Sequence, residues 1–262
     1  MADAILRIAF AAVLGGCFGS FANVLAIRLH TSSSLTGRSH CPACEKPIRP
    51  RHLVPVFSWL ALRGKCADCN AEIHIQYPIV ELIAMLLAVI AALRFDPFSD
   101  PRFYAEMLLG IGLLVLVVMD VRWKELSLEL MAVIGIAGLI IRLSGAVYQD
   151  RLIEEVIFIS VALAVAVGFF GVQWIVSKGR WLGSGDVWFG AMIALLVGWP
   201  GTATAIYLAY LVGGLSVACL VIVGVVKRGM RVPFGPALAI GVLLSLWFGQ
   251  RVEAWFAYAF TS

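Results

Sequence analysis

Two aspartates stand where apolar stretches of the chain meet polar ones. Asp120 ends the run LLVLVVMD, and Asp186 opens the run DVWFGAMIALLV. A carboxylate beside so much apolar sequence is a candidate for function, because burying its charge is costly unless the site pairs or uses it. If the fold brings the two together, both cannot ionise comfortably, and they titrate as one pair.

Such a pair suits the hydrolysis of a peptide bond. One carboxylate activates a water for attack on the carbonyl, while the other donates a proton to the carbonyl oxygen or the leaving amine. Gly183 and Gly185, just before Asp186, would let the backbone approach a substrate or adopt conformations closed to other residues. An ordinary interpretation stays open: Asp186 as a favourable charge at a helix N-terminus and Asp120 as part of an interfacial turn.

Four cysteines form a second candidate site. Cys41 and Cys44 make one CxxC pair, Cys66 and Cys69 another, with 21 residues between the pairs. This spacing is typical of a four-thiolate zinc site, in which the protein fills the tetrahedral shell and the metal is structural. Two disulfides are the alternative, which a reducing compartment disfavours.

The elements that position these residues follow from composition. The 262 residues are 61% hydrophobic and 14% charged, with a mean hydropathy of +0.95, which excludes an ordinary soluble domain. We predict an all-α polytopic membrane protein with about eight transmembrane helices, the first retained rather than cleaved as a signal peptide. They lie at roughly 4–27, 78–94, 103–120, 128–143, 153–176, 186–199, 202–226 and 236–258. The segments at 128–143 and 186–199 are short for a hydrocarbon core of about 30 Å.

The basic residues predict an orientation, because cytoplasmic loops retain Lys and Arg. Assigning alternate loops to the same face places 14 of the 20 Lys and Arg on one side. Both termini are therefore expected to be periplasmic. The polar loop at about 28–77, which carries the cysteines, and the helix ends with Asp120 and Asp186 are expected at the cytoplasmic face. The formal charge of +4 mostly reflects this asymmetry, so we expect no nucleic-acid partner.

Motifs along nearly the whole chain resemble those of the type IV prepilin leader peptidases, which are bifunctional peptidases and N-methyltransferases. GSFANVLAIRLH is similar to the family's N-terminal pattern, and the cysteine loop carries PVFSWLALRGKC and the exit YPIVEL. GSGD matches the GxGD signature, GAMIALLVGWPG its continuation, and VPFGPALAIG the PFGP block. These motifs span residues 19–30, 41–83, 183–186, 190–201 and 232–241.

The resemblance implies a GxGD-type intramembrane aspartic protease with Asp120 and Asp186 as its catalytic pair. It implies an enzyme of the bacterial inner membrane, surrounded by membrane lipids. Its substrates would be the prepilins or pseudopilins of type IV pili or type II secretion, and it would cut their basic leader at the cytoplasmic boundary of the membrane. The new N-terminus would then be methylated with S-adenosylmethionine. Residues 1–95, with the zinc loop, are expected to serve methylation, and residues 96–262 to form the peptidase domain.

Two departures from the family pattern bear on activity. Trp188 stands where members usually carry a lysine, and Ser127 lies in the stretch where a Pro-Asp pair usually follows the first aspartate. Glu129 is a candidate to supply the missing acidic group. These departures leave open a methyltransferase with weakened peptidase activity.

A proton-coupled transporter is the alternative from another class. It would place carboxylates near mid-membrane within an inverted repeat. The sequence instead places both aspartates at one face and shows no obvious repeat.

Three polar residues of the N-terminal part also match family positions. Asn23, Arg28 and Glu81 are candidates to shape the cofactor or substrate surface. Hydrogen bonding at helix ends and interfacial anchoring are the alternative.

Overall fold

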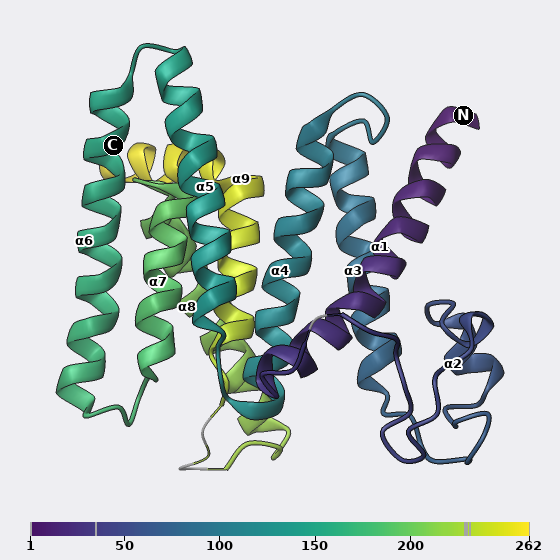
Figure 1. Cartoon of the computed structure of the whole chain (residues 1–262). Helices are drawn as coiled ribbons and strands as arrows, with labels where there is room; N and C mark the ends of the chain where they lie inside the picture. The colour runs from purple at the N-terminus through teal and green to yellow at the C-terminus, as the bar shows by residue number, and fades with distance from the viewer. Residues whose placement is uncertain (1, 35, 228–229, 231, 262) are drawn as a thin grey trace. The chain divides into compact units, whose positions relative to one another are not determined.

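The computed structural model describes residues 2–34, 36–227, 230 and 232–261. Within these ranges the chain is helical and contains no β-strand, as predicted. The elements are α1 (Ala2–His30), η1 (Pro50–His52), α2 (Phe57–Ala61), α3 (Gln76–Arg94), α4 (Pro101–Trp123), α5 (Leu128–Tyr148), α6 (Leu152–Ser177), α7 (Ser184–Val197), α8 (Gly201–Ile222) and α9 (Gly235–Thr261) (Figure 1). Arg228 and Arg231, two of the basic residues used to predict orientation, lie outside the described residues.

Six of these helices are long and apolar enough to cross a membrane: α1 over Asp3–His30, α3, α4, α5, α6 and α8. Two shorter apolar helices, Ser184–Val197 and Gly235–Gly249, complete the set in the described part of the chain. A multi-pass helical membrane protein is therefore confirmed. The prediction of a short helix at 128–143 is wrong, because α5 continues to Tyr148 and has 21 residues.

Polar contacts explain the extra length of α5. Arg142, at its predicted end, donates a hydrogen bond from Nη1 to the carbonyl oxygen of Val197 at 2.6 Å and forms an ion pair with Glu155. With its charge paired inside the unit, Arg142 does not have to end the helix. In contrast, α7 is short as predicted, with 14 residues.

The chain divides into two compact units, Met1–Met119 and Asp120–Ser262. In the first unit, α1 packs against α3 through small residues. A Cβ added at Gly15 would lie 2.6 Å from the Cβ of Ala88, and one at Gly19 would lie 2.7 Å from the Cβ of Ala84. Small residues at these positions allow the two backbones to approach closely, as is common between membrane helices.

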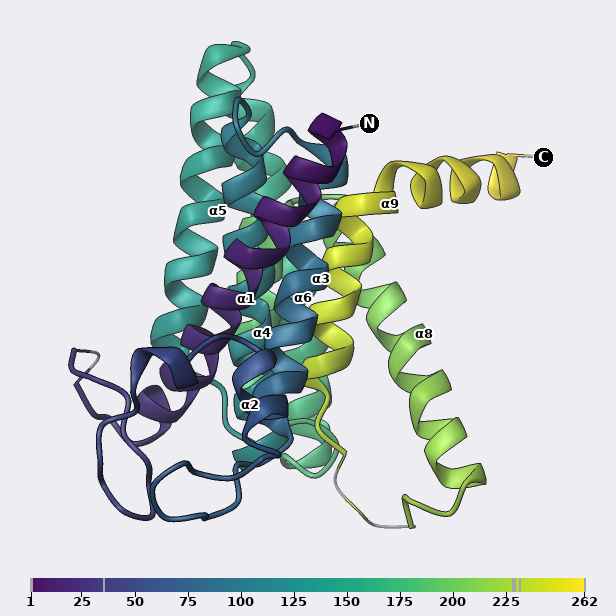
Figure 2. The same ribbon diagram turned by 90° about the vertical axis from the view of Figure 1, so that its right-hand side faces the viewer.

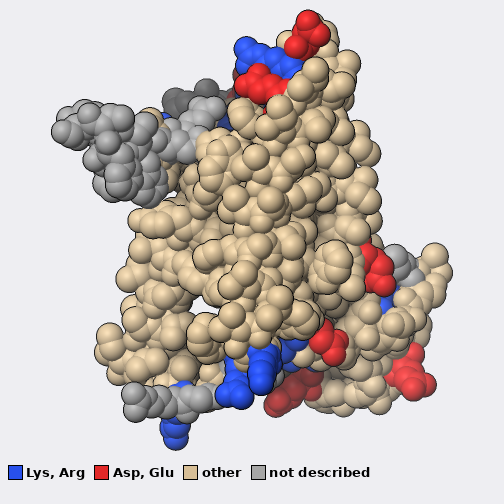
Figure 3. All heavy atoms as spheres, turned by 90° about the vertical axis from the view of Figure 1, so that its left-hand side faces the viewer, with Lys and Arg blue, Asp and Glu red and all other residues tan. Residues whose placement is uncertain are grey.

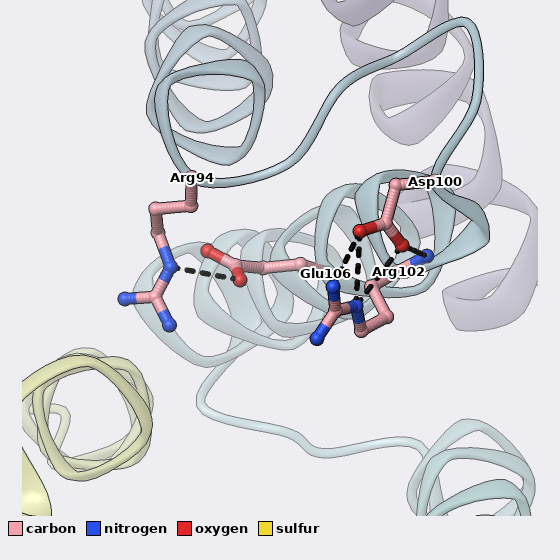
Figure 4. Close-up of polar contacts among 4 residues, drawn as sticks. All are labelled: Arg94, Asp100, Arg102 and Glu106. Atoms are coloured by element: carbon pink, nitrogen blue, oxygen red, sulfur yellow. Dashed lines mark hydrogen bonds and ion pairs between the residues drawn. The ribbon is translucent and has the colours of Figure 1, made fainter.

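Two ion pairs, Arg94 with Glu106 and Arg102 with Asp100, stabilise the loop that connects α3 to α4 (Figure 4). Arg94 Nε lies 3.2 Å from Glu106 Oε2. Asp100 precedes Pro101, the first residue of α4, and accepts hydrogen bonds from the backbone N–H and the side chain of Arg102. The side-chain hydrogen bonds from Arg102 lower the pKa of Asp100. A capping aspartate followed by proline is a strong start signal for a helix, so this end of α4 is well defined.

In the second unit, α7 packs against both α5 and α6, and α8 packs along α9 (Figures 1 and 2). Glycines again allow the close approach: a Cβ at Gly138 would lie 2.8 Å from the Cα of Leu196, and one at Gly241 would lie 2.8 Å from the Cβ of Ala209. This packing fixes the short helix α7, which begins with the GSGD motif.

The outer face of α5 and α6 has the surface expected of a helix pair in lipid. Charged side chains gather at its two ends, and the middle shows no Lys, Arg, Asp or Glu (Figure 3). Asp150, Arg151 and Glu154 are exposed at one end of α6, and Lys178 and Arg180 at the other. Such an apolar band bounded by charges is typical of spanning helices.

Candidate active site and metal centre

Asp120 lies in the last turn of α4 and is 8% exposed. Its Oδ2 accepts a hydrogen bond from the backbone N–H of Gly235, 115 residues later, at 2.6 Å. A Cβ on residue 235 would lie 2.6 Å from the same oxygen, so a side chain does not fit there without displacing the carboxylate. Gly235 therefore places the start of α9 directly against Asp120. Sequence reasoning noted the VPFGP motif but missed this role.

Asp186 lies in the first turn of α7 and is also 8% exposed. Its Oδ2 accepts a hydrogen bond from the backbone N–H of Gly183, the N-cap residue, at 2.9 Å. This carboxylate therefore caps its helix, as the ordinary interpretation expected. The capping contact uses one of its two oxygens, so it does not exclude a catalytic role.

The two glycines of GSGD have ordinary backbone conformations. Gly183 is extended, with φ −77° and ψ 161°, and neither glycine lies in the left-handed region. The interpretation that they adopt conformations closed to other residues is therefore wrong. A Cβ on Gly185 would lie 3.1 Å from Cδ1 of Leu126, so the absent side chain lets α7 approach the segment that follows Asp120.

Asp120 and Asp186 belong to the same unit, Asp120–Ser262. The loop after Asp120 helps to bring them together. Lys124 has a left-handed backbone (φ 57°), and its N–H donates to the carbonyl oxygen of Asp120 at 2.9 Å. Leu126 then packs on Gly185. The segment after Asp120 thus contacts the GSGD motif, although the two aspartates are 66 positions apart in the sequence.

The residues that depart from the family pattern have clear structural positions. Ser127 is the N-cap of α5: its Oγ accepts a hydrogen bond from the N–H of Leu130 at 3.2 Å and donates to Glu129 Oε2 at 2.9 Å. Glu129 is thus held in the first turn of α5. Trp188 is 58% exposed on α7.

An aromatic cluster near the aspartates was not predicted. Tyr210 of α8 donates a hydrogen bond to Oε1 of Gln173 at 2.9 Å, and its ring centroid lies 5.1 Å from that of Phe234 and 5.5 Å from that of Phe169. No motif in the sequence identifies Tyr210, although Phe234 directly precedes Gly235 in VPFGP.

The four cysteines come together as predicted. All four Sγ atoms lie within 4.8 Å of one another, and those of Cys41 and Cys69 are 3.8 Å apart. A tetrahedron with zinc–sulfur bonds of about 2.3 Å has edges of about 3.8 Å, so this separation fits zinc. None of the cysteines forms a disulfide in the described structure.

The surroundings of the thiols shift the pKa values of Cys41 and Cys69 in opposite directions. Backbone hydrogen bonds from Ala43 and Cys44 lower the pKa of Cys41 to about 7. A backbone hydrogen bond from Ala71 lowers the pKa of Cys69, but burial and the neighbouring thiols outweigh it and raise the value to about 12. Four thiols this close together suit a metal cation, because the cation binds the thiolate form and offsets the repulsion between neighbouring thiolates.

The two CxxC segments fold into matching knuckles. In each one the N–H of the first cysteine donates to the carbonyl oxygen five residues later, and the N–H four residues later donates back to the cysteine's own carbonyl. The contacts are Cys41 to Lys46 (3.0 Å), Glu45 to Cys41 (2.8 Å), Cys66 to Ala71 (2.8 Å) and Asn70 to Cys66 (3.0 Å). Glu45 and Asn70 share a φ of 58°. The ligand geometry is therefore local to each knuckle.

Asn23, Arg28 and Glu81 all make structural hydrogen bonds. Fully buried Asn23 donates to the carbonyl oxygen of Tyr77 at 3.3 Å and accepts from Nε2 of Gln76 at 3.3 Å, which joins α1 to the start of α3. Arg28 donates to the carbonyl of Gly37, and Glu81 accepts from the N–H of residue 56. Their proposed role at a cofactor surface stays a prediction.

Comparison with known proteins agrees with the sequence motifs. Residues 13–95 match the bacterial peptidase A24 N-terminal domain, and residues 107–218 match the type IV leader peptidase family. No solved structure matches the chain.

Several curated relatives are similar over most of their length. The prepilin leader peptidase/N-methyltransferase of Stutzerimonas stutzeri is 33% identical over 219 residues, covering 82% of this chain and 73% of the relative. The protein of the same name from Bacillus subtilis is 27% identical over 249 residues, 93% of this chain and 95% of the relative. The type 4 prepilin-like proteins leader peptide-processing enzyme of Escherichia coli is 31% identical over 217 residues, which cover 80% of this chain and 75% of the relative. With both domains matched and relatives of this identity and coverage, the chain belongs to the type IV leader peptidase family.

Proposed function

We propose that this chain cleaves the basic leader peptide from type IV prepilins or pseudopilins and N-methylates the new N-terminus. Its relatives carry both activities in their names. The observation that supports the peptidase most strongly is the arrangement of Asp120 and Asp186: two carboxylates of low exposure in one unit, each held by a backbone N–H, with Leu126 of the segment after Asp120 packed on Gly185.

The proposed mechanism uses the two aspartates as one acid–base pair with a single shared proton. The N–H groups of Gly183 and Gly235 hold Oδ2 of Asp186 and Asp120. We therefore assign the chemistry to Oδ1 of each carboxylate. The ionised carboxylate takes a proton from water as the oxygen attacks the scissile carbonyl, and the protonated one donates to the carbonyl oxygen. Collapse of the tetrahedral intermediate transfers a proton to the leaving amine and regenerates the pair.

The surroundings of the pair suit a substrate with a basic leader and an apolar helix. Glu125 and Glu129 are exposed in the segment that follows Asp120, and their two carboxylates are candidates to contact a basic leader. The rings of Tyr210 and Phe234 continue from Gly235 as an apolar surface against which a substrate helix can pack. The scissile bond would then lie between these two glutamates and the aromatic cluster.

Methylation is assigned to residues 1–95, and the peptidase to residues 96–262. When bound, S-adenosylmethionine would supply the methyl group for the amine that cleavage exposes. Cys41, Cys44, Cys66 and Cys69 would hold a zinc ion that stabilises the loop, because four thiolates leave no position for a substrate.

We place this multi-pass enzyme in the bacterial inner membrane. The charge asymmetry of the loops supports periplasmic termini, with the zinc loop and the aspartates at the cytoplasmic face. This orientation would place the aspartates on the same side as the scissile bond, because the basic leader of the substrate remains on the cytoplasmic side while its apolar helix enters the bilayer.

A methyltransferase with weakened peptidase activity is the second candidate. Ser127 caps α5 where the family usually has a Pro-Asp pair, and exposed Trp188 replaces the usual lysine. A transporter is disfavoured, because both aspartates stand at helix ends rather than near the middle of a span.

Mass spectrometry of a purified substrate tests the two enzymatic candidates. The protein in detergent is mixed with a prepilin that has a basic leader, with and without S-adenosylmethionine. We expect loss of the leader in both reactions and one added methyl group only with the cofactor. If several prepilins keep their leader while pre-cleaved pilin is methylated, the methyltransferase-only function is correct.

A further inference from the structure

An apolar segment interrupts the polar loop between the two cysteine knuckles. Leu53, Val54, Phe57 and Leu60 are 39%, 47%, 69% and 58% exposed within eight residues. The zinc cluster does not use these side chains, and each leaves much of its apolar surface uncovered. Such a concentration of exposed large apolar side chains is typical of an interaction surface.

This segment contacts residues that lie within the candidate membrane spans of its unit. The backbone N–H of Val56 donates to Oε2 of Glu81 at 2.7 Å. Glu81 is five residues beyond Gln76, the start of α3, which places it about 7.5 Å along the helix at 1.5 Å per residue. Pro55 lies against Gly16, within the candidate span of α1: a Cβ on Gly16 would be 3.2 Å from that of Pro55.

A strained turn holds the segment at this position. Val56 has φ 63° and ψ −51°, and the N–H of Phe57 donates to the carbonyl oxygen of Pro55 at 2.6 Å. These values describe a γ-turn with positive φ, a rare conformation and an unusual one for a β-branched residue. Its persistence requires surrounding contacts that fix it, and the bond to buried Glu81 is such a contact.

Five of the seven backbone N–H groups in residues 53–60 donate to an acceptor within the unit, namely those of Leu53, Val56, Phe57, Ser58 and Leu60, which lowers the cost of placing the segment in lipid. Val56 N–H has the Glu81 carboxylate, and residue 55 is a proline without an N–H. The N–H and the hydroxyl of Ser58 both donate to the carbonyl oxygen of Val54, at 3.0 and 2.6 Å. The indole N–H of Trp59 donates to the carbonyl oxygen of Ile73 at 3.0 Å.

Basic residues flank the apolar side chains on both sides. Arg49 and Arg51 precede them, Arg63 and Lys65 follow, and all four are exposed. Residues 49–65 contain no acidic residue. An apolar segment bounded by basic residues is typical of a surface that binds a leaflet of anionic phospholipid. The apolar side chains contact the acyl chains, and the basic side chains contact the anionic headgroups.

We infer that residues 53–60 insert into an anionic phospholipid leaflet beside α1 and α3 and anchor the cysteine knuckles to the membrane surface. Lipid is favoured over a protein partner because the segment is attached within the candidate spans and carries basic residues at both borders. The exposed apolar side chains of α3, including Ile79, Leu82 and Leu86, continue the same kind of surface. This inference is independent of the proposed enzymatic activities.

Photo-crosslinking tests which molecule covers the segment. The full chain, with p-benzoylphenylalanine in place of Phe57, is reconstituted in vesicles of phosphatidylcholine with or without phosphatidylglycerol, irradiated and analysed by mass spectrometry. The control carries the same probe at Ser34, an exposed position in the polar part of the loop. We expect about tenfold more phospholipid adduct at Phe57 than at Ser34. A probe at Leu60 gives a second position if the first variant does not fold.

Each alternative occupant has its own signature. Adducts at both Phe57 and Leu60 with peptides of residues 120–262, or with a second copy of the chain, in place of lipid would overturn the inference. So would equal lipid labelling at Ser34. The combined Arg51→Gln and Arg63→Gln exchange is expected to reduce the preference for phosphatidylglycerol severalfold. An unchanged preference would contradict the part assigned to anionic lipid.

Discussion

The cysteine cluster and the aspartate pair are two polar sites built in different ways. Each cysteine knuckle is closed by backbone contacts within six residues, so the ligands come from two short, self-contained segments. The aspartates instead depend on three helices, because Asp120 lies in the last turn of α4, Asp186 lies in the first turn of α7, and the start of α9 supplies the N–H of Gly235. We therefore expect the cysteine cluster to lose its metal when one cysteine ligand is removed. We expect the aspartate pair to lose activity when one of its helices is displaced, even with both aspartates present.

Loss of a cysteine ligand is the largest expected effect. Cys41→Ser removes one of four thiolates, and structural zinc contributes on the order of 10 kcal/mol of apparent free energy to such a fold. We expect loss of the bound metal and proteolytic cleavage within residues 28–77, measured by metal analysis and limited digestion. Cys219→Ser, at an exposed position in α8, is the control and should keep the metal. Full metal content in Cys41→Ser would contradict the four-thiolate site.

Gly235→Ala should damage the aspartate site without removing a carboxylate. The added Cβ would lie 2.6 Å from Oδ2 of Asp120 and must displace it. A misplacement of about 1 Å in a catalytic group costs about 100-fold in rate, so leader cleavage should fall by about that factor. Gly214→Ala is the matched control, since a Cβ there meets nothing within 4 Å. Equal cleavage rates in the two variants would show that Gly235 does not position Asp120.

Glu81→Leu should destabilise the first unit alone. The exchange leaves the N–H of Val56 without its acceptor, which costs about 1–3 kcal/mol for a buried group. We expect faster hydrogen exchange in residues 53–60, measured by mass spectrometry, with no change around Asp186. The control is Glu154→Leu at an exposed site of α6. Unchanged exchange at residues 53–60 would mean that the carboxylate does not hold the turn.

The smallest expected effect is at the N-cap of α5. Ser127→Ala removes the acceptor for the N–H of Leu130 and should lower the free energy of unfolding by about 1 kcal/mol. Thermal unfolding in detergent would measure the change. Ser144→Ala, near the other end of the same helix, removes a hydroxyl bound to the Ile141 carbonyl and should have a smaller effect. If both variants unfold alike, Ser127 has no special role as a cap.

The same contrast explains what could be predicted from the sequence. Spacing alone identified all four clustered cysteines, because their geometry is encoded in short segments. Hydropathy identified the apolar helices but underestimated α5, since the pairing of Arg142 with Glu155 lies outside any local pattern. The Gly235 contact, 115 positions from Asp120, could not be predicted, because it depends on how α9 packs. The position of Tyr210 and the turn at Val56 likewise depend on contacts with residues far away in the sequence, Gln173 and Glu81, so they appear only in the structure.

The most direct test of the central claim asks whether the two activities separate between the two sites. Asp120→Asn and Asp186→Asn variants are each mixed with S-adenosylmethionine and either prepilin or pre-cleaved pilin, and the products are weighed by mass spectrometry. We predict that both variants leave the leader on prepilin but add a methyl group to pre-cleaved pilin as the unmodified protein does. Leader cleavage that persists in either variant would contradict the assignment of the peptidase to this aspartate pair.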